Sequence, residues 1–172
     1  MNTENIRALS FSVADIASST LTDTHIKELV CESYDAAPES EKDHIVAELV
    51  ANVYRAAPLG VRGQLLQHLL KPLGVLSLVT VANGIFADIL FRSGVTNLQL
   101  AVDDAKEVQA SDVLVLVDYV QQVSRQAVNS LVHVILAEPV LSGSAAATIL
   151  VTVLMNRAKF RRADDGATSA NY

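Results

Sequence analysis

The sequence has almost none of the cysteine on which small secreted domains depend. Cys31 is the single cysteine among 172 residues, which excludes an intrachain disulfide. The N-terminal stretch is acidic and polar where a secretion signal would be basic and then apolar. We therefore predict a protein of the reducing cytoplasm. The neighbouring Glu28, Glu32 and Asp35 are expected to raise the pKa of the Cys31 thiol, so we predict that it is unreactive.

Aromatic residues are also scarce. They make up 5% of the chain and tryptophan is absent, whereas 51% of the residues are hydrophobic. With a mean hydropathy of +0.33, the chain is more apolar than a typical soluble domain and long enough for one aliphatic core. The excess apolar surface has to be buried in a helical core, a subunit interface or lipid. The subunit interface is the favoured destination, which predicts a homo-oligomer.

Catalytic and nucleotide-binding motifs are missing as well. The seven glycines are scattered and form no phosphate-cradling loop. The segment around Ser142 lacks the glycine–x–serine–x–glycine elbow of serine hydrolases. We therefore predict no cofactor and no catalytic residues, although dispersed residues can assemble a site that one sequence does not reveal.

Basic residues are few in the first third of the chain. Residues 1–58 hold ten acids and four bases, whereas residues 59–172 hold nine of each. This imbalance argues against a protein that grips nucleic acid. One basic cluster stands near the C-terminus, at Arg157, Lys159, Arg161 and Arg162. It suits the negative end of a helix dipole and is also a weak candidate for an interaction surface.

The clearest positive feature is an internal echo. The segment from Glu28 to Pro38 returns 20 residues later, from Glu48 to Pro58, with Glu-Leu-Val, Tyr and Ala-Ala-Pro in register. Proline lacks a backbone N–H and ends a helix, and its fixed φ suits the start of the next. The echo predicts consecutive antiparallel helices joined by tight Pro turns, with their matching apolar residues facing one core. A short α-solenoid is the alternative, but two and a half copies fall short of a solenoid.

The apolar periodicity predicts an all-α single domain of about seven helices over residues 1–162, followed by a disordered tail at 163–172. We expect the two most apolar helices, 72–92 and 140–156, to pack centrally, with the acidic helices outside. The predicted helices are 5–18, 24–36, 39–56, 59–71, 72–92, 111–138 and 140–160, with a short further helix beginning near Asp103.

The acidic third helix carries the one arrangement with metal-ligand spacing. Glu41 and His44 lie three residues apart, as in carboxylate di-iron bundles, and Glu48 is one turn further on. A di-iron site would need a second such pair, which the chain lacks. A solvated charge row is the favoured interpretation, and a metal-dependent enzyme at these residues is the weakest of our hypotheses.

The last apolar segment raises the question of a membrane. Residues 139–156 are uncharged and precede the basic cluster, as at the cytoplasmic end of a spanning helix. Several polar and small residues make the segment marginal for a span. Two of the small ones, Gly143 and Ala147, could instead let a partner helix approach closely.

These observations lead to a hypothesis about function. We expect a non-catalytic cytoplasmic protein-interaction or regulatory module that binds itself or a protein partner. A membrane-associated or lipid-binding helical protein is the alternative.

Overall fold

The computed structural model describes residues 23–94, 100 and 102–167, and its regular structure within these ranges is entirely helical. The prediction of an all-α fold is therefore confirmed. The predicted helix at 5–18 lies outside the described residues. In chain order the elements are α1 (Asp23–Ala36), α2 (Glu39–Ala56), α3 (Leu59–Leu70), α4 (Val75–Leu78), the 3-10 helix η2 (Val81–Gly84), α5 (Ile85–Ser93), α6 (Val102–Glu107), α7 (Ala110–Val123), α8 (Arg125–Asn129), α9 (Leu131–Ala137), α10 (Pro139–Ser142) and α11 (Ala145–Ala167).

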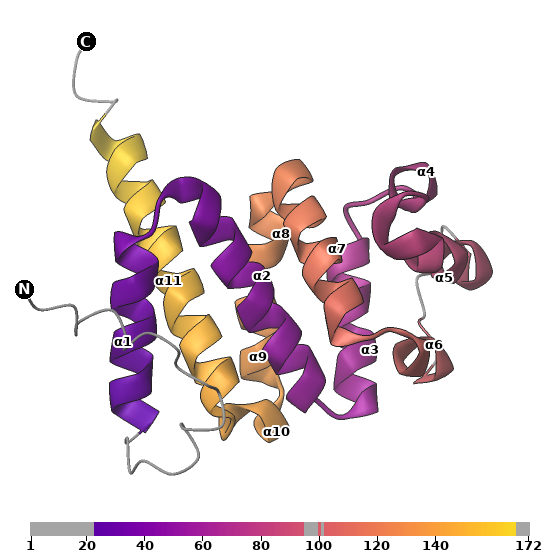
Figure 1. Cartoon of the computed structure of the whole chain (residues 1–172), viewed down its shortest axis with the longest axis horizontal. Helices are drawn as coiled ribbons and strands as arrows, with labels where there is room; N and C mark the ends of the chain where they lie inside the picture. Colours follow the sequence, from indigo (N-terminus) through magenta and orange to yellow (C-terminus); the bar gives the residue numbers. More distant parts are fainter. Residues whose placement is uncertain (1–22, 95–99, 101, 168–172) are drawn as a thin grey trace, which may run out of the picture.

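The echoed segments form equivalent connections. Pro38 and Pro58 precede α2 and α3 with nearly the same backbone angles, φ −64° and −61° with ψ 155° at both. The preceding helices end at Ala36 and Ala56, two residues before each proline, as the sequence predicted. As a result α1, α2 and α3 run in alternating directions (Figure 1).

The first helices do not use one another as their main packing partners. Helix α1 packs on α11, α2 packs on both α7 and α11, and α3 packs on α6, α7 and α9. Figure 1 shows the same interleaving across the molecule. The echoed apolar residues nevertheless face one core, as the sequence predicted, because Tyr34, Val50 and Tyr54 belong to the same buried cluster. Two-residue turns join these helices in sequence, while helices from the second half of the chain fill the space between them.

Helix α2 is central although it belongs to the acidic third of the chain. Because it is covered by α7 on one side and α11 on another, Val46, Val50 and Val53 are almost fully buried. Ile45 and Leu49 of the same helix are only partly buried. Our expectation that the acidic helices lie outside thus holds for α1 and fails for α2.

The predicted helix at 72–92 is neither continuous nor central. It divides into α4, η2 and α5, which form one end of the molecule beside α6 (Figure 1). Three consecutive residues, Ala82, Asn83 and Gly84, have φ values of 47°, 58° and 81° and interrupt the helix. Glycine adopts this left-handed region without steric cost, whereas the backbone at Ala82 and Asn83 is strained because these residues have a Cβ. The segment buries Leu78 and Phe86 but leaves other apolar side chains in water.

The predicted helix at 111–138 is also divided, at Ser124 and Ser130. Ser124 has φ −153° and ψ 93°, and its side chain caps α8 by accepting a hydrogen bond from the Ala127 N–H at 3.3 Å. Helix α7 begins one residue earlier than predicted, with Gln109 as its cap and Asp112 accepting from the Gln109 N–H at 2.8 Å. These breaks explain why the fold has more helices than the seven predicted.

The C-terminal helix α11 has a central part, as the sequence predicted for 140–156. Leu150, Val153 and Leu154 are buried against neighbours that include α1, α2 and α9. Its first turn is separate, because Pro139 starts the short helix α10. The helix continues to Ala167, five residues beyond the predicted end of the domain, and residues 168–172 lie outside the described residues.

Candidate functional site

A groove of about 690 Å³ runs along the outer face of α3. Burial of Leu65, Leu66 and Leu69 fixes the helix so that its polar face turns outward. This face supplies the polar side chains of the groove, namely Gln64, Gln67, His68 and Lys71.

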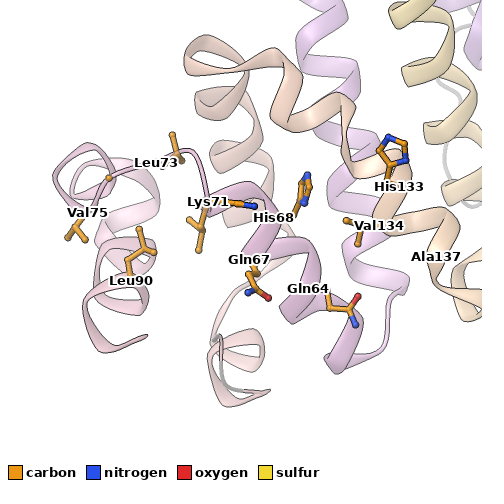
Figure 2. Close-up of a pocket in the computed structure, with 12 residues that line it drawn as sticks. Gln64, Gln67, His68, Lys71, Leu73, Val75, Leu90, His133, Val134 and Ala137 are labelled. Atoms are coloured by element: carbon orange, nitrogen blue, oxygen red, sulfur yellow. The ribbon is translucent and has the colours of Figure 1, made fainter. Parts of the chain in front are cut away.

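Apolar side chains form the two sides of the groove. Figure 2 shows the α3 residues between Val75 and Leu90 on one side and His133 and Val134 of α9 on the other. Leu73, in the connection between α3 and α4, also lines it. Such a mixture of apolar walls and a few polar groups is typical of binding sites.

The groove is basic in character. None of its described lining residues is an aspartate or a glutamate, whereas Lys71, His68 and His133 all line it. Lysine is charged at neutral pH. The groove therefore favours a ligand or partner with negative charge.

His68 is held in place rather than free. Its Nε2 lies 2.6 Å from the Ser130 hydroxyl oxygen, and that hydroxyl donates to the Ala127 carbonyl at 2.8 Å. Because the serine proton is used in that bond, Nε2–H donates to Ser130 and Nδ1 is left as an acceptor. Burial lowers the pKa of His68, and the charges of Lys71 and His133 lower it further.

This pair does not have the arrangement of a nucleophile and its base. In a serine nucleophile the hydroxyl gives its proton to the histidine, whereas here the hydroxyl donates to a backbone carbonyl. Ser130 is also not one of the residues that line the groove. The geometry fits an imidazole fixed for recognition.

Next to the groove, the end of the molecule exposes large apolar side chains. We call residues 75–93, which comprise α4, η2 and α5, the tip. Leu76, Val79 and Phe91 are 91%, 56% and 80% exposed there. Val75 and Leu90 of the same segment line the groove, so the two surfaces adjoin.

The proposed metal residues lie on the exposed face of α2. His44 makes contacts from both ring nitrogens, with Asp118 at 3.2 Å and with Glu48 at 3.6 Å. Glu41 is exposed on the preceding turn. A carboxylate at each ring nitrogen occupies the atoms that would bind a metal. Across the part of the chain that the structure describes, no group of three or more His, Cys, Asp or Glu side chains is arranged to hold a metal ion.

Among the interaction candidates from the sequence, Arg157 has a structural role. Its side chain is 9% exposed, one guanidinium nitrogen binds Asp43, and the other donates to Gln121 at 2.8 Å. Arg125 binds the second Asp43 oxygen at 2.9 Å. We call these four residues the Asp43 cluster, which joins α2, α7, α8 and α11 beside a polar cleft of about 560 Å³.

The other candidates are dispersed along the C-terminal helices. Ala147 is buried inside the subunit, while Gly143 is exposed and a Cβ added there would meet no other atom within 4 Å. Lys159 is exposed. Arg161 and Arg162 belong to α11, and their side chains lie outside the described part of the structure. Gly143, Ala147 and Lys159 are not among the described residues that line the groove, and none of them belongs to the tip.

Cys31 is partly buried on α1, and its thiol pKa is raised, as the sequence predicted. Burial is the larger cause, and Asp35 is the second.

Comparisons with known proteins identify no relative, because the chain matches no family model, no curated protein and no solved structure. The described helices include none with the length and apolarity required to cross a bilayer. The groove and the tip therefore have to be interpreted from their own chemistry.

Sequence reasoning missed the groove for an identifiable reason. His68 lies 62 residues before Ser130 and 65 before His133 in the chain, so no short sequence spacing connects them. The sequence held only an indirect signal for this surface. The long uncharged segment beginning at Pro72 contributes to the excess of aliphatic residues, which predicted exposed apolar surface without its position.

Proposed function

We propose that this chain is a non-catalytic protein-interaction module of the cytoplasm that associates with other copies of itself through the tip. The observation that carries the proposal is the exposure of Leu76 and Phe91, at 91% and 80%, on adjoining helices. Exposed apolar groups gathered in one region mark interaction sites on soluble proteins.

The energetics support a contact larger than the tip. Burying one large aliphatic or aromatic side chain contributes about 1.5 to 3 kcal/mol. Because Leu76, Val79 and Phe91 are already partly covered, together they would contribute on the order of 3 to 7 kcal/mol, while association costs at least about 4 kcal/mol in lost freedom. The apolar walls of the adjoining groove supply further surface. The tip and the groove are therefore proposed as one continuous contact region.

Charge substitution at the tip tests the proposal. The double variant Leu76→Glu/Phe91→Glu places two carboxylates at positions that are already in water, so the fold should be retained. In size-exclusion chromatography with light scattering, the wild type should exceed the 18.4 kDa of one chain and the variant should not. The matched control is Val123→Glu, at a residue 54% exposed at the end of α7, which should behave as the wild type. A variant of unchanged mass would refute the role of the tip.

Lipid is the other surface that an apolar tip could enter, which corresponds to the alternative formed from the sequence. Flotation with phosphatidylcholine vesicles separates the two. Under the proposal the wild type stays with the free protein, and co-flotation that is lost in Leu76→Glu/Phe91→Glu would favour lipid instead.

A further inference from the structure

Two surfaces of the molecule have opposite character. The tip is at one end of the molecule and α1 is at the other (Figure 1). The groove lacks acids among its described lining residues. Helix α1 carries four acids, Asp23, Glu28, Glu32 and Asp35, against the single base Lys27.

The outer face of α1 combines this charge with an apolar group. Glu28 and Glu32 are exposed, and Leu29 between them is 46% exposed. Residues four apart lie on the same face of a helix, about one turn from each other. The face therefore presents two carboxylates one turn apart beside a leucine.

We propose that the outer face of α1 of one copy docks in the groove of the next copy. Glu28 and Glu32 would face Lys71, which follows the last residue of α3 and is the cation of the groove. Leu29 would enter between the apolar walls formed by Val75 and Val134. The inference rests on the proposed function, because it names the partner surface for the same contact region.

The position of the two surfaces determines the kind of assembly. Helix α1 packs on α11 of its own copy and none of its described residues lines the groove, so the groove of each copy is open to the α1 of another copy. A contact between two different surfaces is heterologous and adds copies head to tail, which gives a ring if it closes and a filament if it does not. A symmetric dimer through the tip would use only one surface of each copy.

Charge reversal on either surface tests the docking. Lys71→Glu should weaken self-association by roughly tenfold or more, and so should Glu28→Lys/Glu32→Lys, because each places like charges opposite each other. Sedimentation velocity measures the association and circular dichroism verifies that each variant is folded. The control Lys159→Glu reverses an exposed lysine outside the groove and should associate as the wild type does.

Mixing the two defective variants gives the most specific result. Lys71→Glu retains an intact α1, and Glu28→Lys/Glu32→Lys retains an intact groove. An equimolar mixture should restore association, in assemblies in which the two variants alternate, because the intact pair of surfaces is complementary and the pair of reversed surfaces is complementary as well. Combining all three substitutions in one chain should restore association, since the charges are then complementary again.

The outcomes separate the docking from the proposed function. Association that is lost in Leu76→Glu/Phe91→Glu but unchanged in both charge-reversal variants would retain the tip as an interface and overturn docking by α1. A mixture that stays monomeric would also overturn it. A wild type that is monomeric throughout would overturn the proposed function itself.

Discussion

Removal of the Asp43 carboxylate should be among the more damaging single changes outside the apolar core. Asp43 accepts hydrogen bonds from Arg157 and Arg125, and the Arg157 side chain is only 9% exposed. In Asp43→Ala, Arg157 keeps its bond to Gln121 but loses its compensating charge. Breaking a buried pair in this way costs about 3 to 5 kcal/mol. Because the Asp43 side chain is 25% exposed, water can partly replace it, and we expect about 3 kcal/mol.

For a chain of this length, that loss lowers the melting temperature by about 6 to 12 °C. Thermal and urea unfolding followed by circular dichroism at 222 nm measures it. The matched control is Asp118→Ala, which removes a carboxylate paired with the 53% exposed His44 and should cost less than about 1 kcal/mol.

A second variant separates lost charge compensation from lost packing. Asp43→Ala/Arg157→Met removes both charges, so it should be more stable than Asp43→Ala, although the Gln121 oxygen loses its partner. Equal stability of Asp43→Ala and Asp118→Ala would refute this interpretation of the Asp43 cluster.

Further predictions concern the strained connection and the fixed imidazole. Gly84→Ala should lower the free energy of unfolding by about 1 to 2 kcal/mol, because φ is +81° there and the added Cβ would lie 3.3 Å from the Val79 carbonyl oxygen. Gly63→Ala, inside α3 with open space around the position, should instead raise it by about 0.5 to 1 kcal/mol. His68→Gln should remove a pH dependence: since the folded pKa of His68 is lowered, the unfolded state binds its proton first as the pH falls. The stability advantage of the wild type over His68→Gln should therefore be full above about pH 6.5 and decline at lower pH. Urea titrations between pH 8 and 5 measure it, and an advantage that grows on acidification would show the opposite sign of shift.

The sequence predicted helix bounds correctly where a proline, which breaks helices strongly, stands at the end of the helix. The bounds of α2 agree with the prediction because Pro38 and Pro58 are on either side of it, and α1 and α3 agree to within a residue. The breaks at Ser124 and Ser130 could not be predicted in the same way, because serine is tolerated within helices and ends one only where tertiary packing requires it.

Burial depended on contacts that the sequence does not specify. The segment from Pro72 was expected in the centre because it is uncharged, yet Leu76 and Phe91 are exposed at the tip. The hydrophobicity of a side chain indicates that its burial is favourable. It does not specify whether the side chain is buried by its own subunit or by another one. His68 shows the converse, since it lies on the polar face of α3 and yet Ser130, 62 residues away, binds its ring.

The central claim is that the exposed apolar tip is an interface between copies of this chain. The most direct measurement is equilibrium sedimentation of the unmodified protein over a wide concentration range without detergent. The account predicts an average mass that rises with concentration above 18.4 kDa. A single species of 18.4 kDa at every concentration would contradict it.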